Sequence, residues 1–248
     1  MTDHTPSHHA ASHGEPSYVW REGQERRLAM IRDAAGGLIG KWFLEVGCGI
    51  GLYLEKIAPA AEVAVGLEYE KGRARKAAQR SDWIIQGAGE HLPLPSSAFD
   101  IVLSHEVIEH VADDRAVVKE MVRSLKPGGR LILFCPNRWY PFETHGMYWC
   151  GQYIFGNIPL INYLPRPWRD RLVPHVRAYT AQGVKQLFSD LPVDIRQRRV
   201  IFGAYDNIIA RTPRLGRTIR AILQALEGTP LRFFGLSHFW VVEKTGHE

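Results

Sequence analysis

The chain has 248 residues, of which 45% are hydrophobic and 23% charged, ordinary proportions for a water-soluble globular protein. No apolar run approaches the roughly 18 to 20 residues that cross a bilayer, and the polar, His-rich start is unlike a signal peptide, so we expect a cytoplasmic protein. The formal net charge of +5 is compatible with an anionic substrate, a membrane surface or nucleic acid and selects none of them.

The pattern along the chain predicts a short tail followed by one α/β domain. Residues 1–14 are polar, His-rich and aperiodic, which is typical of a disordered tail, and residues 15–248 form the domain. A helical pattern starts at Ser17 and stops at Gly36 and Gly37. Short apolar strands then alternate with helices: strands 41–46, 62–68, 82–87, 99–106 and 129–136, and helices 52–58, 71–80 and 113–125. This alternation predicts a mostly parallel sheet covered on both faces.

The regular alternation stops after Pro136. Residues 137–178 are rich in Trp, Tyr and Pro, and we expect an insertion that covers a substrate. A helix over 180–191 and strands over 193–202 and 237–244 follow, and a helical insertion occupies 207–235 between these last two strands. The three cysteines, Cys48, Cys135 and Cys150, fit neither a disulfide framework nor a CxxC metal site, and we expect Cys48 and Cys135 to be buried.

A glycine-rich loop at the end of the first strand indicates a nucleotide-like ligand. The segment EVGCGIG places Gly47, Gly49 and Gly51 where ligands bind in open α/β sheets. A dinucleotide fingerprint has G-x-G-x-x-G, whereas here the third glycine comes one residue early. Glu68 ends the second strand, where a carboxylate can accept both hydroxyls of a ribose, so the pattern supports a nucleoside.

Further segments resemble the class I S-adenosylmethionine-dependent methyltransferases. The matching pieces are EVGCGIG, GLEYE, GAGEHLP, FDIVLSHEVIEHV and LKPGGRLI, in this order over residues 43–134. The likeness is greatest to the small-molecule branch (methyltransferase type 11) that includes the ubiquinone and menaquinone pathway enzymes. It implies a seven-stranded Rossmann-like doubly wound sheet, mostly parallel with an antiparallel last strand, and S-adenosylmethionine as methyl donor.

The resemblance also implies which residues bind the donor. The methionine part would lie against Glu45, Gly47, Cys48, Gly49 and Gly51, and the ribose against Glu68 and Tyr69. Ala88, Gly89, Glu90 and His105 complete the predicted set. Relatives often have D-A-E where this chain has Ala88-Gly89-Glu90, so the aspartate that commonly meets the adenine amino group is missing.

Three side chains near the strand ends are candidates for catalysis. Methyl transfer from a sulfonium needs alignment and a dry site, and a hydroxyl acceptor also benefits from a base. His105 and Glu106 end the fourth strand, and His145 follows the fifth. We favour His145 as the base, with His105 as the alternative. His145 could instead anchor the insertion.

The string EVIEH resembles E-x-x-E-H in metal-using relatives, the plant small-RNA 2′-O-methyltransferases and the ubiquinone O-methyltransferases. On a helical turn, Glu106, Glu109 and His110 would share one face, and His145 could be a fourth ligand for a divalent cation. Similar strings occur in relatives with no assumed metal, and Glu109 and His110 could simply cap and pack. We therefore assign no metal site.

Two basic segments lie outside this motif. Arg166, Arg169, Arg171 and His175 could meet an anionic group or a membrane surface. Arg211, Arg214, Arg217 and Arg220 alternate with apolar residues, and a basic amphipathic helix of this kind can lie on an anionic membrane. We favour the simpler interpretation, a solvated basic face over a helix that packs on the core, and leave open a peripheral membrane contact.

The leading functional prediction is a methyltransferase acting on a small hydrophobic or aromatic acceptor, such as a quinone precursor, lipid, glycolipid or secondary metabolite. RNA ribose 2′-O-methylation is an alternative, but no RNA-binding module is attached, so we expect no nucleic-acid partner. A non-catalytic cofactor-binding regulator would be expected to have a degraded glycine loop, whereas this loop is intact. A dehydrogenase would be expected to have its third glycine one residue later, at Leu52. The sequence selects neither the acceptor atom nor the oligomeric state.

Overall fold

The computed structural model describes residues 19–246, so the predicted tail over residues 1–14 lies outside the described residues. Its centre is a seven-stranded sheet with the strand order β10-β11-β5-β4-β1-β2-β3. All neighbours pair in parallel except β11, which is antiparallel to both β5 and β10. The strands are β1 (Trp42–Val46), β2 (Val63–Glu68), β3 (Trp83–Gln86), β4 (Phe99–His105), β5 (Leu125–Pro136), β10 (Val193–Ile201) and β11 (Ser237–Lys244). The predicted fold class is confirmed.

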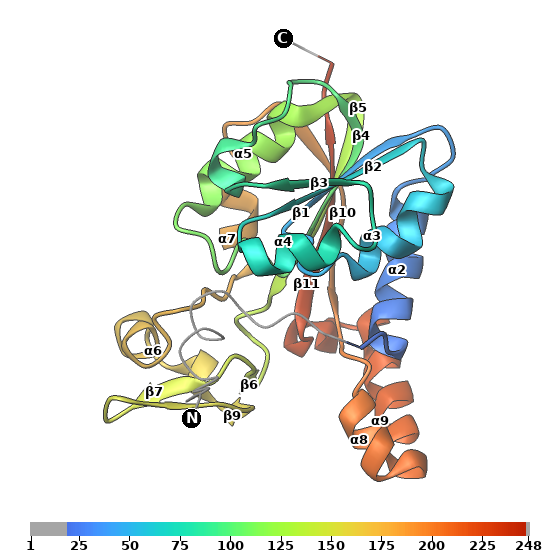
Figure 1. The fold of residues 1–248 in the computed structure, drawn as a ribbon. Helices are drawn as coiled ribbons and strands as arrows, with labels where there is room; N and C mark the ends of the chain where they lie inside the picture. Colours follow the sequence, from blue (N-terminus) through green and yellow to red (C-terminus); the bar gives the residue numbers. More distant parts are fainter. Residues whose placement is uncertain (1–18, 247–248) are drawn as a thin grey trace, which may run out of the picture.

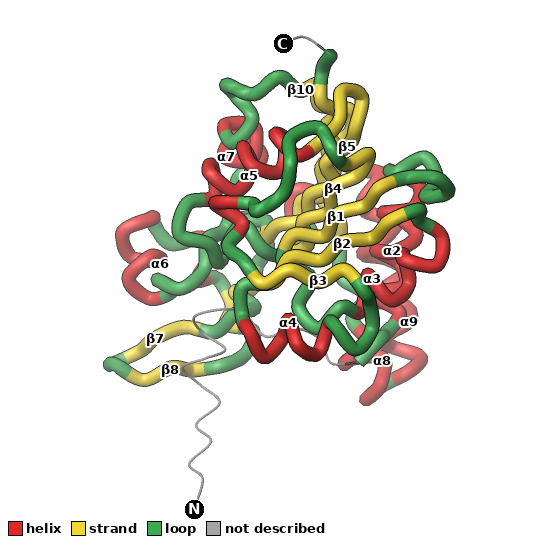
Figure 2. Tube along the Cα trace, turned by 45° about the horizontal axis from the view of Figure 1, so that its top comes forward, coloured by secondary structure: helices red, strands yellow, loops and turns green. Residues whose placement is uncertain are grey.

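Helices cover both faces of the sheet because the central strands are apolar on both sides (Figures 1 and 2). One face packs against α2 (Glu22–Ala34) and α3 (Leu52–Ile57) through Leu28, Ile31 and Leu54. The other packs against α5 (Asp114–Ser124) and α7 (Ala181–Gln186) through Val118 and Val184. The remaining core helix, α4 (Lys71–Ala77), contributes Ala77 to the first cluster, and short 3-10 turns η1 (Ala58–Ala60) and η2 (Gly89–His91) follow α3 and β3.

Two insertions extend from the same edge of the sheet. Since β5 and β10 run in the same direction, the segments that follow them leave at the carboxyl edge, where β1, β2 and β4 also end. The first insertion, which we call the lid (residues 137–178), holds two small two-stranded sheets, β6–β9 and β7–β8, and one α-helix (Figure 1). Its elements are β6 (Phe142–Glu143), β7 (Met147–Trp149), β8 (Gln152–Ile154), β9 (Ile158–Pro159), η3 (Ile161–Tyr163) and α6 (Arg166–Leu172).

The second insertion, expected to be helical over 207–235, contains two α-helices. They are α8 (Asp206–Arg211) and α9 (Pro213–Ala225), followed by η4 (Leu226–Gly228) and η5 (Pro230–Phe234). Pro213 disfavours helical backbone in the residue before it, and Thr212 is extended, with φ −137° and ψ 79°. Gly216 lets the helices meet, since a Cβ there would lie 2.7 Å from the Ile209 backbone.

Other boundaries also differ from the sequence prediction. Strand β5 begins at Leu125 and not at the expected residue 129, with a register shift against β4 between Phe99 and Ile101 and a left-handed Gly128. Helix α2 begins at Glu22, later than the expected Ser17, and α4 and α7 end before residues 80 and 191, where the sequence pattern had placed their ends. Among the described residues, no helix is both long and apolar enough to cross a bilayer.

Candidate functional site

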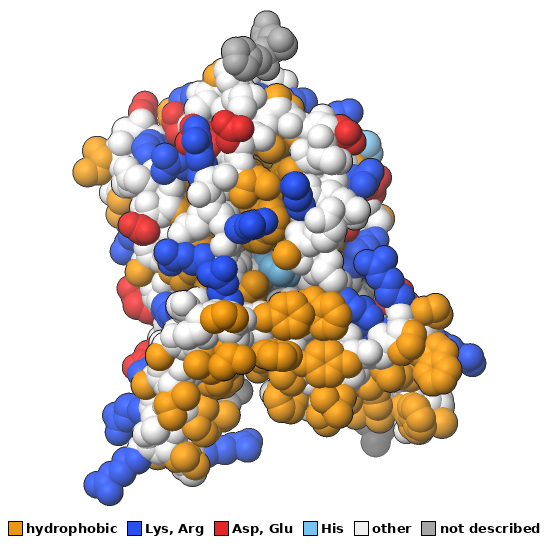
Figure 3. Space-filling model, turned by 180° about the vertical axis from the view of Figure 1, so that it is seen from behind, with side chains coloured by type: hydrophobic (Ala, Val, Ile, Leu, Met, Phe, Trp, Pro, Cys, Tyr) orange, Lys and Arg blue, Asp and Glu red, His pale blue; other side chains and the backbone are white. Residues whose placement is uncertain are grey.

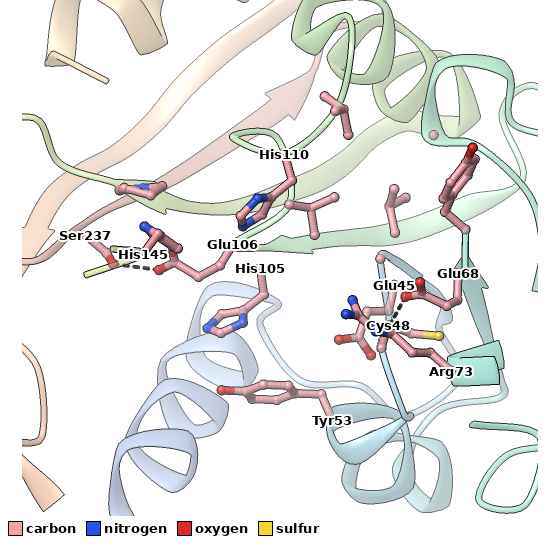
Figure 4. Close-up of a pocket in the computed structure, with 18 of the residues that line it drawn as sticks. Glu45, Cys48, Tyr53, Glu68, Arg73, His105, Glu106, His110, His145 and Ser237 are labelled. Carbon is pink, nitrogen blue, oxygen red and sulfur yellow. Dashed lines mark hydrogen bonds between the residues drawn. The ribbon is translucent and has the colours of Figure 1, made fainter. Parts of the chain in front are cut away.

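A cavity of about 920 Å³ lies at the carboxyl edge of the sheet, between the ends of β1, β2 and β4, helix α2 and the first insertion. Every residue predicted to bind the donor or to act in catalysis lines the cavity except Gly51, and Tyr69 is largely exposed. Figure 4 shows Glu45, Cys48 and Glu68 toward one end of this cavity and His145, Glu106 and Ser237 toward the other. The cavity therefore has two chemically distinct ends.

The glycine loop forms the floor of the first end. Gly47, Gly49 and Gly51 all have left-handed backbones, with φ of 75°, 57° and 81°. A Cβ on Gly47 would lie 2.5 Å from a methyl of Val107, so a side chain there is excluded on steric grounds as well. The amides of Gly47 and Cys48 both donate to the Leu67 carbonyl, at 2.8 and 2.9 Å, which fixes the loop against β2.

Two buried carboxylates, Glu45 and Glu68, lie at this end. Glu68 accepts from the amides of Gly49 and Glu70, at 2.8 and 2.9 Å. Glu45 has a buried Oε2 with no hydrogen-bond partner. Burial and the neighbouring Glu68 raise the pKa of Glu45 well above its usual value. A ligand with a cationic group would supply the missing partner, and the ammonium group of S-adenosylmethionine fits this requirement.

The other predicted donor-binding residues are placed around the same end. Ala88 and Gly89 line the cavity with their backbone, and a Cβ on Gly89 would lie 3.2 Å from Val117. Glu90 accepts from the Ala112 amide at 3.1 Å, which ties η2 to the segment before α5. Cys48 and Cys135 are buried as expected, and burial raises the pKa of the Cys48 thiol.

His105, at the end of β4, is engaged by a residue that the sequence did not indicate. Arg27 of α2 donates from Nη1 to His105 Nε2 at 2.6 Å. Burial and the Arg27 charge lower the pKa of His105 to about 3. Because its Nε2 lone pair is occupied and its conjugate acid is strongly disfavoured, His105 is a poor general base.

Glu106 forms a small polar network with Arg27 and Ser237. It has a left-handed backbone (φ 55°) and accepts from the Ser237 hydroxyl at 2.6 Å, with Arg27 Nη2 at 3.3 Å. Burial opposes ionisation of Glu106, but Arg27 and the other nearby donors outweigh it and lower the pKa of its carboxyl. Glu106 is thus an ionised, well-held group with little tendency to take a proton.

His145 lies beside a buried carboxylate in the lid. Its Nδ1 is 2.9 Å from Glu143 Oε1, and its backbone amide donates to the same oxygen at 3.0 Å. Burial opposes ionisation of Glu143, yet its contacts with His145 and Arg169 lower its pKa, so the carboxylate accepts and Nδ1 carries the proton. The free Nε2 of this cavity-lining imidazole is then the nitrogen that can take a proton.

Arg169 holds this pair in place and does not face solvent. It is 1% exposed and donates to Glu143 Oε2 at 2.9 Å, to Asn162 Oδ1 at 3.1 Å and to the Val176 carbonyl at 3.1 Å. The expectation that Arg169 meets an external anion or a membrane is therefore wrong. His175 is also occupied within the lid, with Nε2 3.1 Å from the His145 carbonyl.

The E-x-x-E-H residues do not form the helical turn assumed from their spacing, since only a short non-helical turn follows Glu106. Ligand atoms of Glu109, His110 and His145 nevertheless lie within 4.8 Å of one another, without Glu106. Both carboxylate oxygens of Glu109 are buried without partners, and burial together with Glu106 raises its pKa. Burial and His145 lower the pKa of His110 to about 3. This donor set fits a divalent cation.

Arg27, Ser237, Tyr53 and Asn137 line the cavity but were not predicted. Asn137 directly follows β5, so its position at a strand end was a signal that could have been used. It donates to the carbonyls of Phe233 and Gly235, at 2.8 and 2.7 Å. Arg27 and Ser237 come from helix and strand segments distant in sequence, and no local pattern marks them.

Fold and site together define a Rossmann-like protein with a glycine-rich loop, two buried carboxylates beside it and a lid that carries a histidine–carboxylate pair. The methyltransferase domain family matches residues 44–133, the stretch that holds the loop and both carboxylates. Residues 44–133 are therefore similar to methyltransferase domains, and most of the chain shares its fold with S-adenosylmethionine-dependent methyltransferases.

Among curated proteins, the ubiquinone biosynthesis O-methyltransferase of Escherichia coli O157:H7 is 33% identical over 119 residues, which are 45% of this chain and 50% of that protein. The chain thus spans about half the length of the curated relatives it matches.

Solved structures share the fold. An S-adenosylmethionine-dependent methyltransferase from Mesorhizobium loti superposes with a TM-score of 0.62 at 16% identity, over 87% of this chain and 96% of that one. The [4+2]-cyclase SpnF superposes with a TM-score of 0.61 at 15% identity, over 93% and 84% of the two chains. Since a cyclase has this fold, the reaction must be argued from the site.

Proposed function

We propose that the protein transfers a methyl group from S-adenosylmethionine to a hydroxyl of a small hydrophobic or aromatic acceptor. The observation that carries this proposal is the His145–Glu143 pair facing the same cavity as the glycine loop, Glu45 and Glu68. At about 920 Å³ the cavity is at the upper end of the range for small-molecule sites, which suits a donor and an acceptor bound together.

The donor, when bound, supplies an activated methyl group on a sulfonium. Glu45 would hold its ammonium group and Glu68 its ribose hydroxyls, which fixes the direction of the methyl. Tyr140 and Phe142 line the lid side of the cavity and would pack against an apolar acceptor. His145 Nε2 would take the proton of the acceptor hydroxyl as its oxygen attacks the methyl carbon, and Glu143 would stabilise the imidazolium.

The acceptor class rests on two further supports. The curated relatives are named as O-methyltransferases, and the methyltransferase domain family matches residues 44–133, which include Glu45 and Glu68. A histidine base is useful for a hydroxyl and less so for an amine, which is already nucleophilic when neutral. Both points favour oxygen as the acceptor atom.

The test combines binding with turnover. We expect S-adenosylhomocysteine, but not NADH, to give binding heat in titration calorimetry. With an alkyl catechol as the acceptor probe, His145→Ala should lower kcat by about 10²- to 10⁴-fold, the range for losing a general base, and leave S-adenosylhomocysteine affinity unchanged. His91→Ala, at an exposed histidine of η2, is the matched control and should behave as wild type.

A raised KM with intact kcat in His145→Ala would make His145 a binding residue and remove the base from the mechanism. Methylation of an RNA fraction, with no activity on phenolic or lipid acceptors, would replace the proposed acceptor class by RNA.

A second candidate is a metal-assisted form of the same reaction, favoured by the buried, unpartnered carboxylate of Glu109. Glu109, His110 and His145 would hold the cation, which would lower the pKa of the acceptor hydroxyl by charge. In that case EDTA should abolish turnover, Mg²⁺ or Zn²⁺ should restore it, and Glu109→Gln should be as inactive as His145→Ala. Full activity in EDTA would exclude this version.

A further inference from the structure

The two insertions together present an exposed apolar surface. Figure 3 shows hydrophobic side chains gathered across the lower part of the molecule, from the α8–α9 hairpin to the lid. We define this apolar face by six exposed side chains from η3, α9 and η5: Tyr163, Leu215, Ile222, Leu231, Phe233 and Phe234. Large exposed patches of this kind usually mark an interaction site.

The expectation that the basic helix packs on the core is wrong. Leu215, Ile219 and Ile222 share one face of α9, as the sequence indicated, but Leu215 is 58% and Ile222 57% exposed. The buried residue of α9 is Gly216, which presses on Ile209 of α8. The two helices therefore pack on each other at Gly216 and leave Leu215 and Ile222 exposed.

Aromatic contacts join this hairpin's segment to the lid. Phe233 stacks on Trp139 with ring centroids 5.1 Å apart, and Trp139 lies 6.3 Å from Tyr163. Phe234 meets Phe233 edge-on at 5.3 Å. Because η5 follows α9 through η4, these rings connect side chains from both insertions into one surface.

The charges on the segments that carry the apolar face are mostly positive. The stretches 144–169, 207–226 and 228–242 contain no Asp or Glu, and among the acids that border them are Asp170, Asp206 and Glu227. They carry exposed arginines, among them Arg166, Arg211, Arg214, Arg217 and Arg232, whereas Arg220 pairs with Glu22. Apolar side chains flanked by an excess of exposed arginines complement a lipid surface with an apolar interior and negatively charged head groups.

We propose that the apolar face docks onto an anionic lipid bilayer and brings the cavity mouth to the membrane. Tyr163 of the face follows Asn162, and Phe234 precedes Leu236 by two residues. Both Asn162 and Leu236 line the cavity. An acceptor dissolved in the bilayer could then reach the cavity beneath the lid without crossing water.

Vesicle co-sedimentation of the full chain tests this proposal. We expect binding to phosphatidylglycerol–phosphatidylcholine vesicles, weaker binding at high salt, and little binding to pure phosphatidylcholine. Arg214→Gln/Arg217→Gln should weaken binding by about 25-fold, since each basic residue near such a surface contributes about fivefold. Leu215→Ser/Ile222→Ser should weaken it by about tenfold or more at constant charge.

Matched double variants at surfaces away from the face are the controls. Arg75→Gln/Arg115→Gln removes two exposed arginines from α4 and α5, and Ile39→Ser/Trp83→Ser removes two exposed apolar side chains near the amino edge of the sheet. Both should bind as wild type, and circular dichroism checks that every variant is folded.

Three results would overturn the proposal. The first is absence of binding to the anionic vesicles, and the second is an equal loss of vesicle binding in the face variants and the control variants. The third is a dimer in sedimentation velocity that dissociates in Leu215→Ser/Ile222→Ser, since a second copy of the chain would then cover the apolar face. Neither donor nor acceptor is present in this assay, so its failure leaves the proposed methyl transfer untouched.

Discussion

Gly47→Ala should be among the most damaging single-methyl additions in this chain, for two separable reasons. Gly47 has φ 75°, which an L side chain adopts with strain. The added Cβ would also lie 2.5 Å from one Val107 methyl and 3.0 Å from the other. Gly37 has a similar φ of 87°, but nothing lies within 4 Å of an added Cβ there, so Gly37→Ala carries the backbone strain alone.

The expected magnitudes follow from these contacts. A left-handed alanine costs about 1 to 2 kcal/mol, which should be the full effect of Gly37→Ala. Overpacking against a β-branched side chain adds about 1 to 3 kcal/mol at Gly47. We therefore expect Gly47→Ala to lower the free energy of unfolding by about 2 to 5 kcal/mol. Val107 lines the cavity, so its displacement should also weaken S-adenosylhomocysteine binding.

Urea unfolding measures the stability difference, and titration calorimetry measures the affinity. Val107→Ala removes both methyls that the new Cβ would meet, so in a double-mutant cycle the pair Gly47→Ala/Val107→Ala should recover about 1 to 3 kcal/mol relative to additivity. If Gly47→Ala is no more destabilising than Gly37→Ala, or if the cycle shows no coupling, the steric argument for this loop is wrong.

Three further predictions concern the site. Glu68→Gln should weaken S-adenosylhomocysteine binding by about 1.5 to 3 kcal/mol in calorimetry, the range for hydrogen bonds to a charged group, and a change of a few tenths would place the ribose contact elsewhere. Arg169→Met leaves the Glu143 charge buried without its arginine partner and should lower the free energy of unfolding in urea by about 3 to 5 kcal/mol. Arg171→Met, at an exposed arginine of the same helix, should change it by no more than about 0.5 kcal/mol. Equal effects would contradict the conclusion that Arg169 holds Glu143 in place. The pKa of His105 is lowered to about 3 in the fold. The stability contributed by its neutral imidazole is therefore complete above the pKa of the unfolded chain, and it is lost as the pH falls from there toward about 3. Below roughly pH 6.5, His105 changes the free energy of unfolding by at most about 1.4 kcal/mol per pH unit. Unfolding of His105→Gln, measured from pH 7 to 5, should lack this part of the pH dependence.

Local pattern determined the strands, the donor loop and the class of the protein. The apolar runs around β1, β2, β4 and β5 can only be buried strands, and a loop of alternating glycines at the end of β1 needs left-handed backbone, which Gly47, Gly49 and Gly51 all have. Glu68 is set by the same rule, because it ends the strand next to that loop. These features depend on neighbours within one strand–loop–helix unit, so the sequence carries them directly.

Features that depend on contacts between distant segments were decided by the tertiary structure. Arg27 lies far from His105 in sequence, yet its position makes that imidazole a poor base, and Arg169 was expected at the surface but is buried against Glu143. The amphipathic pattern of α9 is the same whether its apolar side meets a core or is exposed, and a close packing at Gly216 left it exposed. Periodicity reports which residues share a face, whereas only the packed chain decides what that face meets.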